Sequence, residues 1–124
     1  MKLSNMWHKK LFALLCGLVL YGYATWYGAD FHGLPTATGE TYNMYAFTTA
    51  CHYSLLGKRM EVTIMDGSDG SEVVICNDTG PFRWDAQWGW VHLGRHRIDL
   101  SMIAFSKLAP LGAGIIPVKI EVQD

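Results

Sequence analysis

The sequence of 124 residues has few cysteines, few charged residues and no apolar run long enough to cross a membrane. Its main apolar stretch, Leu11 to Leu20, has ten residues, whereas a membrane-spanning helix needs about 20. After residue 24 no cluster of Lys and Arg with interleaved aromatic residues occurs, which argues against nucleic-acid binding. Internal repeats are also absent. The length therefore allows one compact domain, and a hydrophobic content of 50% predicts that it folds.

Charge is distributed unevenly along the chain. Residues 1–24 contain three lysines and no acidic residue, whereas the remainder has seven basic and eleven acidic residues. A basic start, a short apolar stretch, and small residues at Gly22 and Ala24 are typical of an export signal cleaved after Ala24. An uncleaved membrane anchor, or a lipoprotein with Cys16 as the lipidated residue, are the alternatives. We therefore expect residues 1–24 to be a signal or anchoring segment. Residues 25–124 are expected to form an exported domain, periplasmic or extracellular, that is monomeric and has no other membrane contact.

Only two of the three cysteines, Cys51 and Cys76, follow the predicted signal. In an oxidising compartment they can form a disulfide that closes a loop of about 25 residues. The alternative is two separate buried thiols. No C-x-x-C spacing is present, and the four histidines after residue 24 are scattered. We therefore expect no metal site and no cofactor.

Short segments of alternating hydrophobicity predict a mainly β domain. In the clearest, Met60, Val62 and Ile64 alternate with polar residues, residues 66–70 form a turn, and residues 72–76 return as a second strand. Further strands are expected at residues 25–27, 44–50, 98–100 and 115–122, with a break at 77–81. Ser101 is expected to cap a short helix that runs to about Leu108. Many short strands with one helix indicate a small barrel or sandwich.

Four segments, in this order, resemble the RlpA family of double-psi β-barrels, which are related to expansins and family 45 glycosidases. They are residues 24–28 (ATWYG), 36–40 (TATGE) with Tyr42, 77–82 (NDTGPF) and 97–101 (RIDLS). The resemblance covers residues 24–122 and implies a six-stranded double-psi barrel with one short helix. It also implies a peptidoglycan lytic transglycosylase that cleaves the bond between N-acetylmuramic acid and N-acetylglucosamine and forms an anhydro sugar. The alternative is a non-catalytic, expansin-like module that binds glycan strands.

Two aspartates are the candidate acids for this chemistry. Cleavage of a glycosidic bond needs a carboxylic acid that stays protonated near the working pH, which burial favours. Asp78 follows an apolar strand and precedes a Gly-Pro turn, and Asp99 lies between Ile98 and Leu100. The resemblance assigns Asp78 as general acid and then base, with Asp99 as a possible second carboxyl group. Both aspartates can instead be caps of turns or helices.

The resemblance adds Glu40 and His52 to the candidate catalytic residues. His52 is expected either to orient Asp78 or the substrate, or to be a hydrogen-bonded structural histidine. Two features depart from the family pattern: Asn43 replaces the usual aspartate, and the segment from His52 to Gly57 is one residue short. Asn43 is retained as a candidate substrate-binding residue.

Aromatic residues are the remaining candidates for substrate binding. Trp26 and Tyr27 lie in the first matching segment. An insertion between Phe82 and Arg97 adds Trp84, Trp88 and Trp90. Aromatic faces stack on the apolar faces of sugar rings, so this insertion is expected to form a loop that contacts glycan. The alternatives are a hydrophobic plug for the barrel and a contact with a protein partner.

Overall fold

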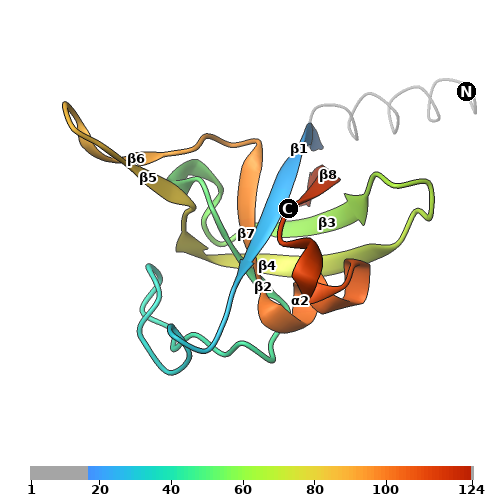
Figure 1. Ribbon diagram of the computed structural model, residues 1–124, viewed down its shortest axis with the longest axis horizontal. Coiled ribbons are helices and arrows are strands. Elements are labelled where there is room, and N and C mark those ends of the chain that lie inside the picture. The colour runs from blue at the N-terminus through green and yellow to red at the C-terminus, as the bar shows by residue number, and fades with distance from the viewer. Residues whose placement is uncertain (1–16, 124) are drawn as a thin grey trace, which may run out of the picture.

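Six strands close into a barrel in the computed structural model, which describes residues 17–123 (Figure 1). Their order around the barrel is β1-β7-β2-β4-β3-β8. Their bounds are β1 Leu18–Tyr27, β2 Thr48–Cys51, β3 Arg59–Ile64, β4 Ser71–Thr79, β7 Arg97–Ser101 and β8 Ile116–Gln123. The strands β5 (Phe82–Asp85) and β6 (Gly89–His92) form a separate two-stranded hairpin that projects from the barrel. The predicted six-stranded double-psi β-barrel is confirmed.

Parallel and antiparallel neighbours alternate where the candidate aspartates lie. Strand β1 pairs in parallel with β7, and β2 pairs in parallel with β4, whereas β2 and β7 are antiparallel. Parallel strands cannot be joined by a tight turn, so the chain crosses the barrel between them. The loop from residue 28 to residue 47 joins β1 to β2 and lies beside the end of β4, because Thr38 N–H donates to the Asn77 carbonyl oxygen.

The predicted hairpin at residues 60–76 is confirmed as β3 and β4. Met60, Val62 and Ile64 point into the core, as alternation requires, and Val74 and Cys76 return on the opposite strand. The barrel core consists mainly of aliphatic side chains, and each of the six strands contributes at least one residue to it. The β3–β4 hairpin is therefore the part of the barrel that the sequence pattern predicts best.

The predicted helix is also confirmed, as α2 (Met102–Leu108). The Ser101 hydroxyl accepts a hydrogen bond from Ala104 N–H, which caps the first turn. Phe105 is fully buried and packs beside Trp26. Among residues 17–123 no helix has the length and apolar character needed to cross a membrane.

The first strand begins earlier than the expected domain boundary at residue 25. Residues 18–24 pair with β8 along the whole segment, and Leu20 and Ala24 are buried in the core. A Cβ atom at Gly22 would overlap the backbone carbonyl of His96, the residue just before β7. The small residues at 22 and 24 thus have a packing role in the barrel. The predicted signal mostly falls in residues 1–16, outside the described residues.

Two other segments differ from the expected pattern. The strand expected at residues 44–50 begins only at Thr48, because the Asn43 side chain accepts a hydrogen bond from Tyr45 N–H and holds a turn there. The break expected at residues 77–81 begins only after Thr79. Strand β4 continues because Asp78 and Thr79 pair with Ala50 and Cys51 of β2 after a register shift.

Candidate active site

Asp78 and Asp99 lie on two strands that flank β2. Ala50 pairs with Asp78 across the parallel β2–β4 ladder and with Asp99 across the antiparallel β2–β7 ladder. Residues opposite one another in adjacent strands direct their side chains to the same face of the sheet. Both aspartates and Ala50 accordingly line one recess of about 250 Å³. The structure thus brings the two sequence-predicted acids together.

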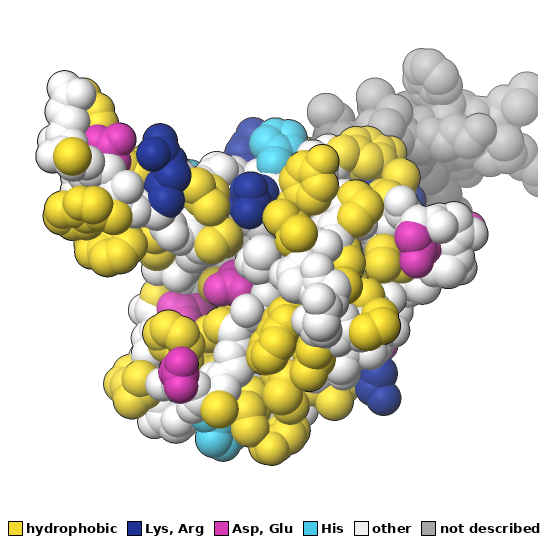
Figure 2. Space-filling model, in the orientation of Figure 1, with side chains coloured by type: hydrophobic (Ala, Val, Ile, Leu, Met, Phe, Trp, Pro, Cys, Tyr) yellow, Lys and Arg dark blue, Asp and Glu magenta, His cyan; other side chains and the backbone are white. Residues whose placement is uncertain are grey.

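This recess is part of a longer groove. A second recess, of about 510 Å³, shares Tyr27, Phe31 and Asp99 with the first and extends along the end of β1. Figure 2 shows acidic side chains on the floor of a hollow that lies below the projecting hairpin. Phe31 is 52% exposed and borders both recesses. Phe31 is not among the residues predicted from the sequence, because no local pattern marks a side chain that a long loop brings to the groove.

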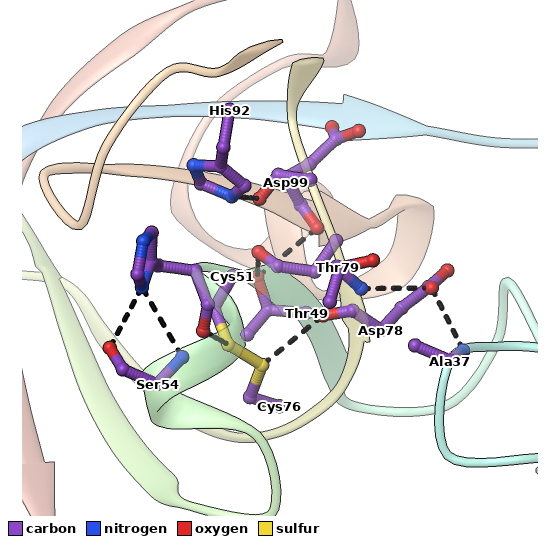
Figure 3. Close-up of a disulfide and its surroundings, with 12 residues drawn as sticks. Ala37, Thr49, Cys51, Ser54, Cys76, Asp78, Thr79, His92 and Asp99 are labelled. Atoms are coloured by element: carbon purple, nitrogen blue, oxygen red, sulfur yellow. Dashed lines mark hydrogen bonds between the residues drawn. A yellow bond between two sulfur atoms is a disulfide. The ribbon is translucent and has the colours of Figure 1, made fainter. Parts of the chain in front are cut away.

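The Asp78 carboxylate is fixed mainly through one oxygen. Its Oδ1 accepts hydrogen bonds from Ala37 N–H at 3.0 Å and from Thr79 N–H at 2.9 Å (Figure 3). Its Oδ2 accepts a longer bond, 3.4 Å, from the Tyr27 hydroxyl. The end of β1, the following loop and the residue next to Asp78 therefore orient this carboxylate, and Oδ2 is the oxygen with less hydrogen bonding.

Asp99 differs from Asp78 in its surroundings. Burial raises the pKa of Asp99 to about 6, the hydrogen bond from the Thr25 hydroxyl lowers it, and the negative charge of Asp78 raises it. The bond from Thr25 to Asp99 Oδ1 is 3.1 Å long. A carboxyl group with a pKa near 6 exchanges protons close to neutral pH, as a general acid requires.

Tyr27 and Tyr42 form the aromatic wall beside Asp78. The two rings are stacked, with centroids 4.1 Å apart, and Phe31 meets the Tyr27 ring edge to face at 5.7 Å. The Tyr42 hydroxyl donates to the Tyr27 backbone oxygen at 2.6 Å. Burial raises the pKa of Tyr42 to about 12, and burial followed by the charge of Asp78 raises the pKa of Tyr27 still further. Both phenols are therefore neutral hydrogen-bond donors.

His52 lies next to this region and makes no hydrogen bond to either aspartate. Its Nδ1 accepts a hydrogen bond from Ser54 N–H, which caps the 3-10 helix Tyr53–Leu55. Its ring lies 5.1 Å from the ring of His92. Desolvation lowers the pKa of His52, and the charges of His92 and Arg95 lower it further. The local geometry matches the structural alternative for this histidine.

His92 connects the insertion to the groove. Its Nδ1 accepts a hydrogen bond from Gly94 N–H at 2.8 Å, so the hydrogen bond of 2.9 Å between its Nε2 and the Gly80 carbonyl is donated by His92. Gly80 lines the groove beside Asp78. The ring of His92 thus fixes the backbone that shapes one groove wall.

Two further candidates lie in the exposed loop between β1 and β2. The Glu40 carboxylate accepts a hydrogen bond from the Thr38 hydroxyl, and the Asn43 side chain caps its own turn. Neither residue lines the groove recesses that contain Asp78 or Asp99.

The candidate tryptophans occupy two different places. Trp26 borders the larger recess, but its indole N–H donates to the Leu111 carbonyl and its ring packs beside Phe105. Trp84, Trp88 and Trp90 belong to the β5–β6 hairpin and are 63%, 73% and 70% exposed. The expected loop is thus an ordered hairpin, and it does not plug the barrel.

A disulfide joins Cys51 and Cys76, whose Cα atoms are 6.1 Å apart. It links β2 to β4 directly beside the register shift that aligns Ala50 with Asp78. Within the described part of the chain, no group of three or more His, Cys, Asp or Glu side chains is placed to hold a metal ion.

The fold is a double-psi β-barrel with two carboxyl groups in one groove. The Lytic transglycolase family model matches residues 20–120, and the chain belongs to this family.

Among curated relatives, the chain is 39% identical over 105 residues to the endolytic peptidoglycan transglycosylase RlpA of Pseudomonas aeruginosa, covering 85% of this chain and 28% of that protein. It is 41% identical over 106 residues to RlpA of Vibrio cholerae, covering 86% of this chain and 36% of that protein. The chain thus spans about a third of the length of these relatives.

Solved structures share the fold at lower identity. The Streptomyces papain inhibitor matches with a TM-score of 0.65 and 21% identity, covering 86% of this chain and 96% of that one. The expansin of Clavibacter michiganensis matches with a TM-score of 0.64 and 19% identity, covering 86% and 51%.

Proposed function

We propose that this protein is a peptidoglycan lytic transglycosylase, which cleaves between N-acetylmuramic acid and N-acetylglucosamine in an exported, periplasmic or extracellular location. The observation that carries the proposal is the pair of carboxyl groups, Asp78 and Asp99, on one groove floor. Membership in the Lytic transglycolase family and the names of the RlpA relatives support the same activity.

Asp99 is the proton donor in this proposal. The sequence resemblance assigns the proton transfers to Asp78, but of these two half-buried carboxyl groups it is Asp99 whose pKa is raised, to about 6. Its acid form donates the proton to the glycosidic oxygen while the bond from that oxygen to C1 of the muramic sugar breaks. The C6 hydroxyl of the same sugar then attacks C1, and its proton passes to the Asp99 carboxylate. The anhydro ring closes and Asp99 is again an acid.

Asp78 stabilises the positive charge that develops in this step. The transition state resembles an oxocarbenium ion, with positive charge on C1 and the ring oxygen. The hydrogen bonds from Ala37 and Thr79 fix Oδ1, while Oδ2 has only the longer bond from Tyr27. A carboxylate that is oriented in advance stabilises such charge without reorganisation during the reaction.

The test is product analysis with the full chain and purified glycan strands that carry no peptides. Mass spectrometry should detect products that end in anhydro-muramic acid with the wild type. Asp99→Asn and Asp78→Asn should abolish these products. The control is Asp69→Asn, a matched change in the exposed β3–β4 turn, which should leave the product yield unchanged. Binding of glycan without any anhydro product would contradict the proposal and support the expansin-like binding module instead.

A further inference from the structure

One face of the β5–β6 hairpin carries a ladder of aromatic rings. Phe82 pairs with His92 and Trp84 pairs with Trp90 across the two strands. Pairs two residues apart along a strand lie on the same face, whereas the intervening pair of Arg83 with Val91 lies on the other. Ring centroids are 5.1 Å apart in the first aromatic pair and 5.4 Å apart in the second.

The ladder begins inside the groove that contains Asp78 and Asp99, which we call the acid groove. Phe82 lines the same recess as Asp78 and Asp99. His92 packs edge to face against Phe82 and is held to the groove wall through the Gly80 carbonyl. Because Trp84 and Trp90 follow on the same face, an aromatic track continues from the groove floor outward along the hairpin.

The outer part of this track is uncovered. Trp84 and Trp90 pack against each other but are otherwise mostly exposed. Figure 2 shows hydrophobic side chains gathered on the projecting β5–β6 hairpin, beside the hollow that contains acidic side chains. Indole rings are costly to leave in water, so a paired, exposed set next to a groove marks a binding surface.

We propose that the ladder of Phe82, Trp84, Trp90 and His92 is an additional glycan subsite for sugar rings of the strand that occupies the acid groove. This inference rests on the proposed function. No Asp, Glu, Lys or Arg belongs to these two pairs, and both ring nitrogens of His92 are used in hydrogen bonds, which suits an uncharged ligand. Sugar rings have apolar faces that stack on indole and phenyl rings. Trp88 lies in the turn between the strands and is not part of the ladder.

The test compares the affinity for long glycan strands with the affinity for a tetrasaccharide of the same repeat. Both affinities are measured by calorimetry on the full chain. The protein carries the Asp99→Asn change, which prevents cleavage of the glycan. In this background, the preference for long strands should fall when Trp84→Ala or Trp90→Ala is added. We expect the Kd for long strands to rise on the order of tenfold for each, equivalent to about 1.4 kcal/mol. Trp84→Phe should keep most of the affinity, because it keeps an aromatic ring in the ladder.

Tyr21→Ala is the matched control, because Tyr21 is an aromatic residue of 61% exposure on β1 and borders neither groove recess that contains Asp78 or Asp99. It should not change either Kd. Equal Kd values for the Asp99→Asn protein with and without the ladder changes on long strands would overturn the inference. Product analysis separates the two proposals. Ladder-dependent binding by a wild type that forms no anhydro product would refute the enzyme and retain the subsite.

Discussion

The acid groove and the β5–β6 hairpin are neighbours, but different contacts hold them. Asp78 and Asp99 are fixed by the register of three strands and by hydrogen bonds from Ala37, Thr79 and Thr25. The hairpin is a separate sheet whose large side chains remain exposed. The barrel thus supplies the precise positions that proton transfer needs, and the hairpin supplies surface for binding. Substitutions in the two regions should therefore have different consequences.

The largest expected effect is on catalysis. Asp99→Asn removes the proton donor, and kcat should fall by about 10²–10⁴-fold, the usual contribution of a general acid. Trp84→Ala should instead leave kcat on a tetrasaccharide unchanged and raise KM on long strands. Steady-state kinetics on both substrates measure these values. A loss of kcat in Trp84→Ala as large as that in Asp99→Asn would remove the distinction between the two regions.

The second prediction compares one glycine in each region. Gly22→Ala should lower the free energy of unfolding by about 3 kcal/mol or more, because the new Cβ overlaps the His96 carbonyl between β1 and β7. In the hairpin, Gly89→Ala meets only the Trp84 ring at 3.9 Å, and its positive φ of 78° should cost about 1–2 kcal/mol. Urea unfolding measures both. An equal loss in the free energy of unfolding for the two variants would contradict the view that the barrel tolerates less change than the β5–β6 hairpin.

The third prediction concerns the disulfide that joins β2 to β4. Replacing both cysteines, in the variant Cys51→Ala/Cys76→Ala, should lower the free energy of unfolding by about 3 kcal/mol, given the loop that the bond closes. Urea unfolding with and without reductant provides the measurement. Reductant should destabilise the wild type and leave the variant unchanged. A wild type that is insensitive to reductant would refute the stabilising role of the bond.

The barrel could be predicted from the sequence better than the β5–β6 hairpin, because local sequence signals mark the barrel elements and none marks the hairpin. Strict alternation at Met60, Val62 and Ile64 and the capping hydroxyl of Ser101 are local signals, and the structure has both elements where they were expected. The start of β1 was missed because Leu18 and Leu20 continue an apolar run and resemble part of an export signal. The β5–β6 hairpin was expected only as a loop, because no Asn-Gly or Asp-Gly turn marks it.

The candidate site was predicted only in part. Asp78 and Asp99 were identified as residues, but their common position depends on the pairing of both with Ala50, which no local pattern reveals. For the same reason Thr25 and Phe31 were not recognised as neighbours of the acids. Glu40 and Asn43 were included because of the family pattern, and their side chains are used in local hydrogen bonds of the loop.

The smallest expected effect tests the pKa of Asp99 through one hydrogen bond. The Thr25 hydroxyl lowers the pKa of Asp99, so Thr25→Val should raise it. Since the protonated acid is the active form, activity falls as pH rises through this pKa. The alkaline limb of the kcat/KM profile should therefore move to higher pH in the variant. An alkaline limb that stays in place or moves to lower pH would contradict the assignment of this limb to Asp99.

The central claim is that the pKa of Asp99 is raised beside Asp78, so that a fraction of this carboxyl group is protonated close to neutral pH. A titration of the carboxyl carbon of Asp99 by NMR in the full chain, with Asp99→Asn used to assign the signal, tests it directly. The account predicts a midpoint at about 6. A midpoint near 4, the usual value for aspartate, would show that the pKa of Asp99 is not raised and would contradict its role as the proton donor.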